Sequence, residues 1–234
     1  MSVRSFTSET TVRLGDVARD GTIRLAALAR HLQDVAFDDV RDAGLGGDGN
    51  WVVRRVALDV DGLPGFGERI RLETSCTGIG PRWAERVTDV RGRRGAHVAS
   101  RALWVFVDAS GRPRALPAEF RDRYPVPDER TRISPKLHHP GPPASVSRHP
   151  WPLRAADFDV MGHMNNAAYW DPIDDEVAAR AGTDLRRAEL EYRAGIAPGD
   201  AVTVAMERPV GEGPLRVWLE SGGEVRASAQ VWGR

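Results

Sequence analysis

The residues best suited to chemistry fall within one ten-residue stretch in the second half of the chain. Asp157 and Asp159 supply two carboxylates, His163 supplies an imidazole, and Asn165 and Asn166 supply two side-chain amides. The stretch passes from an extended approach into a helical pattern. No other part of the sequence is as dense in groups that move protons or hold an anion.

This pattern suits acyl transfer to water. The N-terminus of a helix carries unpaired N–H groups and a positive partial charge, so a carbonyl oxygen placed there is polarised. His163, oriented by Asp159, can activate a water molecule against that carbonyl. A purely structural explanation also fits, in which an Asn caps the helix and the carboxylates hold a tight turn. The excess of polar groups over what a cap needs favours a site.

Composition excludes several other classes of protein. The formal charge of zero gives no overall field that would attract nucleic acid or an anionic membrane. The single cysteine, Cys76, cannot form an intrachain disulfide, which favours a reducing cytoplasmic compartment. The polar start of the chain does not resemble a signal peptide, and no apolar run approaches the length of a membrane span.

No cofactor is expected, because the proposed chemistry needs only water and protein side chains. The adjacent His138 and His139 lie among prolines with no acidic residue nearby in sequence. This setting favours a solvated linker over a metal site.

Hydrophobic periodicity predicts the same series of elements twice. Apolar residues at three- and four-residue spacing predict a long helix over 22–43, and alternation predicts strands on either side of it. A proline-rich segment, 117–143, then interrupts the pattern. The expected strands are 10–17, 51–61, 69–76, 83–90 and 97–107, and after the interruption 145–153, 185–192, 201–207, 215–220 and 225–232, with a second helix over 166–182.

Specific residues also recur at fixed spacing, which indicates an internal duplication. Five residues reappear identically or conservatively 132 positions later, and four more reappear 128 positions later. They are Arg54, Arg55, Leu58, Gly67 and Glu68 in the first set, and Gly95, Ala99, Ser100 and Trp104 in the second. We therefore expect an α+β fold of two units, 1–116 and 144–234, each with a long helix packed on an antiparallel sheet. Placed side by side, the two sheets can join into one.

The segment from Asp159 through Tyr169 resembles the Asp-x-Asn-x-His-x-Asn-Asn segment of acyl-acyl-carrier-protein thioesterases, which are double hotdog proteins. The resemblance extends over nearly the whole chain. It includes Leu32-Gln33-Asp34-Val35-Ala36 in the first helix, Trp104-Val105-Phe106-Val107-Asp108, and Leu190-Glu191-Tyr192-Arg193.

The resemblance implies hydrolysis of a fatty acyl thioester, on acyl carrier protein or coenzyme A, to a free fatty acid. It assigns Asp159 and His163 to the catalytic set, with Asn165 and Asn166 at the helix N-terminus. Two positions depart from the family: Met161 stands where an Asn is expected, and Gly195 where an acidic residue is expected. We consider Glu191, four residues before Gly195, as a substitute acid.

Three questions remain open at this point. The protein could bind acyl thioesters without hydrolysing them, or act as a dehydratase on hydroxyacyl thioesters, which also needs a His and an acid at a helix N-terminus. We expect four apolar or aromatic residues to line an acyl tunnel, although ordinary core packing is the alternative: Trp151, Met161, Met164 and Tyr169. Pairing of two chains into a homodimer is not decided by the sequence.

Overall fold

A computed structural model describes residues 4–45, 50–126, 134–178, 184–208, 211 and 213–233. Within these ranges, ten strands form one antiparallel sheet. The strands are β1 (Ser5–Thr11), β2 (Asn50–Asp61), β3 (Arg69–Ile79), β4 (Trp83–Gly92), β5 (His97–Val107), β6 (Ser147–Trp151), β7 (Leu185–Tyr192), β8 (Val202–Glu207), β9 (Leu215–Ser221) and β10 (Glu224–Gly233). The α-helices are α1 (Leu25–Asp42), α2 (Ala118–Arg123) and α3 (Asp171–Ala178).

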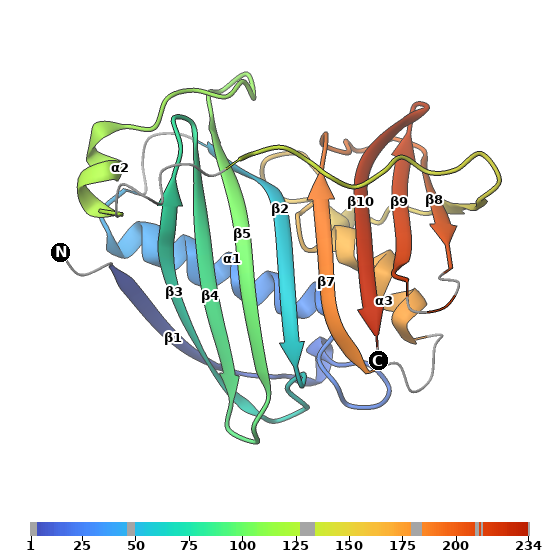
Figure 1. The fold of residues 1–234 in the computed structure, drawn as a ribbon, viewed down its shortest axis with the longest axis horizontal. Coiled ribbons are helices and arrows are strands. Elements are labelled where there is room, and N and C mark those ends of the chain that lie inside the picture. Colours follow the sequence, from blue (N-terminus) through green and yellow to red (C-terminus); the bar gives the residue numbers. More distant parts are fainter. Residues whose placement is uncertain are drawn as a thin grey trace.

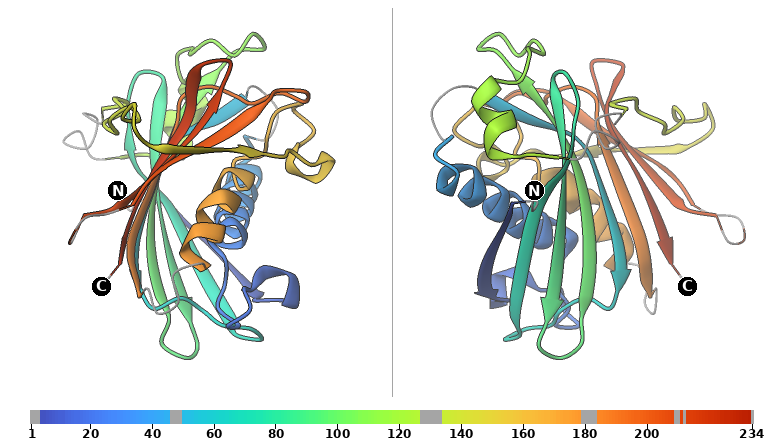
Figure 2. Two further views of the ribbon diagram at one scale, coloured as in Figure 1. Left: turned by 90° about the vertical axis from the view of Figure 1, so that its right-hand side faces the viewer. Right: turned by 60° about the vertical axis from the view of Figure 1, so that its left-hand side comes forward.

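The strand order across the sheet is β1-β3-β4-β5-β2-β7-β10-β9-β8-β6. The first five strands therefore occupy one half of the sheet and the last five the other half, joined where β2 pairs with β7 (Figure 1). Helices α1 and α3 lie on the same face of this sheet, and the sheet curves around them (Figure 2). None of the helices within the described ranges has the length and apolar character needed to cross a membrane.

Most elements lie where hydrophobic periodicity predicts them, with three differences. The first strand covers residues 5–11 rather than 10–17, and Leu14–Asp16 forms a short 3-10 turn. The proline-rich segment contains α2, which periodicity does not predict because it is a six-residue helix among prolines. Its Phe120 packs on Trp51 and Tyr124, at ring-centroid distances of 5.0 and 4.8 Å. The expected second helix over 166–182 differs too: Ala168–Trp170 forms a 3-10 turn, and α3 begins only at Asp171 and covers eight residues. Residues 179–182 of that expectation lie outside the described residues.

Residues 134–143 of the proline-rich segment cross the face of the sheet opposite the helices (Figure 1). Lys136 O accepts from Arg55, and Pro140 O accepts from the Trp218 indole at 2.8 Å. His139, expected in a solvated linker, is instead buried, and its ring lies 3.4 Å from the Glu189 carboxylate. The hydrogen bond to His139 is the main reason that the pKa of Glu189 falls to about 2. The expectation of a solvated His139 is therefore wrong.

Helix α1 begins without a capping side chain of its own. The residue at its N-cap is Arg24, which makes no side-chain cap. Asp174 of α3 supplies the cap instead: its carboxylate accepts the N–H groups of Leu25 and Ala26 at 2.7 and 2.9 Å. The two helices are thus tied together end to side, and the N-terminal partial charge of α1 is satisfied by an anion from the other half of the chain.

This partly buried cap makes the stability of the protein depend on pH. Burial raises the pKa of Asp174 from 3.8 to about 6, against the opposing effect of the two N–H groups. Between these pH values the folded protein binds more protons than the unfolded chain, so the free energy of unfolding falls as pH rises. We expect urea unfolding to show that the stability of the wild type relative to Asp174→Asn declines across this window and is constant below and above it. A difference that does not change with pH would contradict this role of Asp174.

Candidate functional site

A tightly folded loop holds the ten-residue polar stretch. Asp157 accepts the Arg154 N–H at 2.7 Å and closes the first turn of the loop. Phe158 and Met164 then pair across a narrow bridge. Gly162 adopts a φ of +76°, which residues with a Cβ rarely do, and so lets the chain reverse between them. Asp157 therefore does hold a tight turn, as the purely structural explanation expects, and the loop places His163 at an exposed position.

The His163 imidazole is held in one orientation. Its Nδ1 lies 3.2 Å from the Met161 carbonyl oxygen. Because a carbonyl oxygen only accepts hydrogen bonds, Nδ1 carries the proton in the neutral ring and Nε2 offers a lone pair. The edge of the ring packs against the backbone of Gly195, where a Cβ would lie 2.8 Å from His163 Cδ2.

Asp159 and Asn165 form a second pair in the loop. One oxygen of Asp159 accepts the Met161 N–H at 2.9 Å, and the other accepts from Asn165 Nδ2 at 3.3 Å. Asn165 Oδ1 in turn accepts the Ala167 N–H at 3.0 Å. Asp159 therefore positions an amide and the loop backbone, and the hydrogen bond between its carboxylate and the His163 ring that we expected is not formed.

Asn166 connects the loop to the other half of the protein. Its side-chain Nδ2 donates to Gln33 Oε1 of α1 at 3.4 Å, and its carbonyl oxygen accepts the Tyr192 hydroxyl at 3.0 Å. Burial raises the pKa of Tyr192, so its hydroxyl stays protonated and remains a donor. Asn166 is thereby fixed between a helix of the first half and a strand of the second.

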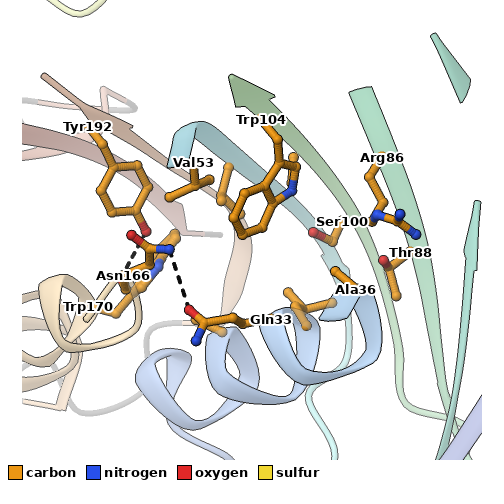
Figure 3. A pocket seen from close by; sticks show the side chains of 14 residues that line it. Gln33, Ala36, Val53, Arg86, Thr88, Ser100, Trp104, Asn166, Trp170 and Tyr192 are labelled. Atoms are coloured by element: carbon orange, nitrogen blue, oxygen red, sulfur yellow. Dashed lines mark hydrogen bonds between the residues drawn. The ribbon is translucent and has the colours of Figure 1, made fainter. Parts of the chain in front are cut away.

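A pocket opens beside Asn166, between α1 and the concave face of the sheet (Figure 3). Trp170 and Tyr192 lie at the same end of the pocket as Asn166, and Gln33 faces them from α1 (Figure 3). Small and branched apolar side chains line the middle of it: Ala29, Leu32, Ala36, Val53, Val56 and Ala102. The space therefore runs from the second half of the chain into the first.

The residues expected to line an acyl tunnel lie elsewhere. Met164 and Tyr169 are buried in the main core, Trp151 packs at its margin, and Met161 is 55% exposed. The Tyr169 hydroxyl instead accepts the Ile196 N–H at 3.1 Å. None of these four belongs to the pocket lining that the structure describes, which agrees with the alternative of ordinary packing.

Glu191 is not brought to the loop. Strand β7 ends at Tyr192, so Gly195 does not continue it, and Glu191 points to the opposite face from Tyr192. There its fully buried carboxylate accepts the backbone N–H groups of His138 and His139 at 2.6 and 3.1 Å. The expectation that Glu191 replaces the missing acid is therefore corrected: it anchors the segment that crosses the outer face.

Sequence reasoning also missed Gln33. It lies on the stripe that α1 turns toward the pocket, with Ala29 and Leu32 before it and Ala36 after it. A polar residue within an otherwise apolar stripe is the signal that marks it. Its partner, Asn166, is 133 positions away, which no local pattern reveals.

Comparisons with known proteins agree with this architecture. The family models described as "Acyl-ACP thioesterase N-terminal domain" and "Acyl-ACP thioesterase C-terminal domain" match residues 3–124 and 142–230. An uncharacterized protein of Mycobacterium tuberculosis is 27% identical over 92% of this chain and 86% of its own length. A chloroplastic acyl-[acyl-carrier-protein] hydrolase of Cuphea viscosissima is 25% identical over 97% of this chain, which spans only 62% of that enzyme's length.

Among solved structures, an acyl-ACP thioesterase from Bacteroides thetaiotaomicron superposes with a TM-score of 0.83 over 98% of both chains, at 22% identity. At this identity the likeness shows a shared fold. Together, the two family models cover both halves of the sheet and the loop that carries His163. The chain therefore belongs to the acyl-ACP thioesterase family.

Proposed function

We propose that the protein hydrolyses fatty acyl thioesters on acyl carrier protein, and releases a free fatty acid. The observation that carries this proposal is the position of Asn166, which belongs to the polar loop and also lines the pocket. An acyl chain in the pocket would place its thioester carbonyl at Asn166 and the loop. Family membership and the similarity to the Cuphea hydrolase support the same activity. Coenzyme A thioesters are a second substrate class within this proposal.

The side chains divide the reaction as follows. Nε2 of His163 takes a proton from a water molecule, whose oxygen attacks the thioester carbon. The oxyanion that forms is stabilised by the Asn166 side-chain amide. When the carbon–sulfur bond breaks, the protonated His163 returns the proton to the thiolate. Asp159 acts through Asn165 and the loop backbone, so its role is to position the other groups.

We also infer that the chain consists of two tandem hotdog units, 1–116 and 144–234, joined by the segment 117–143. The pairing of β2 with β7 supports this inference. Ala57 pairs with Glu189, its counterpart at the spacing of 132, and the flanking pairs Arg55–Glu191 and Asp59–Arg187 are related by the same exchange. Such a register is what two copies of one unit produce across a two-fold axis.

The loops support the duplication too. Arg13 and Asp16 form the same closure as Arg154 and Asp157: the Arg13 N–H donates to Asp16 at 2.7 Å. Gly21, with a φ of +82°, corresponds to Gly162. In the first unit, however, Thr22 stands where His163 stands in the second, so only the second unit carries the proposed chemistry.

Three further features belong to this proposal. The buried, unpaired Cys76 is consistent with a reducing cytoplasm. A role in fatty acid biosynthesis would follow from the carrier-protein substrate. Pairing into a homodimer would be a property of the whole protein, to be measured by its mass in solution.

The central test is turnover of a panel of acyl carrier protein thioesters, followed by thiol release. We expect His163→Ala to lower turnover by about a hundredfold or more, because it removes the general base. The control is His149→Ala, which changes an exposed histidine on the edge strand β6 and should leave turnover unchanged. No turnover by the wild type on any chain length, with binding retained, would favour a non-catalytic binder. A product lighter by one water with the thioester intact would indicate a dehydratase.

A second test concerns the contact between Gly195 and His163. In Gly195→Ala, the added Cβ would lie 2.8 Å from His163 Cδ2 and push the ring away from Met161. We expect turnover to fall by at least about tenfold, because small displacements of catalytic groups are costly. Stability should change little, since Gly195 is exposed and has no positive φ.

The matched control is Gly15→Ala, because a Cβ at Gly15 meets nothing within 4 Å and its φ is not positive. Turnover of Gly195→Ala equal to that of this control would show that the position of the His163 ring is not critical.

A further inference from the structure

Gln33 of α1 and Asp174 of α3 stand at equivalent positions in the two halves of the chain. They are 141 residues apart, which is also the spacing of the loop residues that correspond between the halves. These pairs are Arg13 and Arg154, Asp16 and Asp157, and Gly21 and Gly162. At the same spacing, Leu25 at the start of α1 corresponds to Asn166.

Each of these two side chains reaches into the other half. Asp174 accepts the backbone N–H groups of Leu25 and Ala26 at the start of α1. Gln33 Oε1 accepts from the Asn166 side chain, at 3.4 Å from Nδ2. The contact between the halves is therefore made by a carboxylate in one direction and by a neutral amide in the other.

The pocket lies at the neutral contact. Gln33 and Asn166 both belong to its lining, and they face each other across its end (Figure 3). Neither Asp174 nor Leu25 belongs to the pocket lining that the structure describes. The end of the second half that carries the proposed chemistry is thus the one without a carboxylate from the other helix.

Gln33 holds the Asn166 amide in one orientation. The Tyr192 hydroxyl fixes the backbone of Asn166 through its carbonyl oxygen. The acceptor at Gln33 Oε1 turns the NH2 group of the Asn166 side chain toward α1. Because this group is planar and has two N–H bonds, a partner for one of them also fixes the direction of the other.

The neutral charge of Gln33 matters because the proposed reaction creates a negative charge beside Asn166. A carboxylate in place of the Gln33 amide could accept the same N–H, but it would lie close to the oxyanion. Two like charges about 5 Å apart in a partly buried site repel strongly enough to slow a reaction by about a hundredfold.

We propose that Gln33 is a positioning residue for the hydrolysis, and that its neutral amide keeps the site open to a forming oxyanion. The reactive centre then needs both halves of the chain: His163 and Asn166 from the second, and Gln33 from the first. This inference rests on the proposed function, since it adds a residue to the same site.

The first experiment replaces Gln33 by Glu and by Leu, and measures kcat and KM for acyl carrier protein thioesters across pH. Gln33→Glu keeps the acceptor and adds a charge, so we expect kcat to fall by about a hundredfold at neutral pH, with KM changed by less than about threefold. This deficit relative to the wild type should shrink as pH falls, because protonation makes the introduced carboxyl group neutral. Gln33→Leu removes the acceptor without adding a charge, so kcat should fall by about tenfold at every pH.

The matched controls are Gln230→Glu and Gln230→Leu. Gln230 lies on β10 between the core residues Ala229 and Val231, so its side chain points to the face of the sheet opposite the helices. These two changes should leave kcat unchanged. A kcat of Gln33→Glu within about threefold of the wild type, or a deficit of the same size at every pH, would overturn the proposal.

The second experiment does not depend on turnover. NMR signals of the Asn166 side-chain amide are identified as those absent from Asn166→Ala, and the exchange of their protons with water is measured. We expect this exchange to be about fivefold faster in Gln33→Leu, because the hydrogen bond that protects the amide is lost, and unchanged in Gln230→Leu.

The two experiments separate this inference from the hydrolase proposal. Equal exchange in Gln33→Leu and the wild type would reject the positioning role of Gln33, even if thioesters were hydrolysed. Faster exchange in Gln33→Leu, with no thioester hydrolysed by the wild type, would support the positioning of Asn166 and count against the hydrolase proposal alone.

Discussion

The pairing of β2 with β7 is the constraint on which the site depends. It joins two five-stranded halves into one curved sheet, and so it forces α1 and α3 onto the same concave face. Only this arrangement lets Gln33 of α1 reach Asn166. The pocket is likewise a product of the junction, because its lining draws on α1, on β2, β4 and β5, and on the loop of the second half.

Within the loop, some side chains hold the backbone in shape and others are available for the proposed reaction. The side chains of Asp157, Asp159 and Asn165 each accept a backbone N–H group and so stabilise the shape of the loop. His163 and Asn166 are the members left facing outward or toward the pocket. The departures at Met161 and Gly195 fit this division: Met161 contributes its carbonyl oxygen to orient the imidazole, and Gly195 leaves space for the ring.

Sequence periodicity predicted the elements whose bounds are set by the burial of apolar residues along the element itself. β5 and β7 have the bounds that alternation of apolar residues gives, because buried and more exposed residues alternate along much of each strand. It failed for α2, where packing of Phe120 on Trp51 outweighs the proline-rich context.

The site was likewise predictable only in part. The polar loop was visible as a cluster of residue types, whereas the fates of Glu191 and His139 were not. Both depend on which face of the sheet the connecting segment crosses, and this is a property of the tertiary structure alone. The pocket lining was missed for a related reason, since it joins residues from distant parts of the chain.

The carboxylate of Asp174 at the start of α1 has a consequence for stoichiometry. The first unit has its own helix N-terminus in the place where the second unit has Asn166, and that position is filled by an anion that the chain itself supplies. A symmetric pair of such units would offer two acyl sites that compete for the space between the helices and the sheet. Here the Asp174 carboxylate takes one of the two positions, so under the proposed function the protein would hold one acyl chain, with the interior of the first unit left to accommodate it.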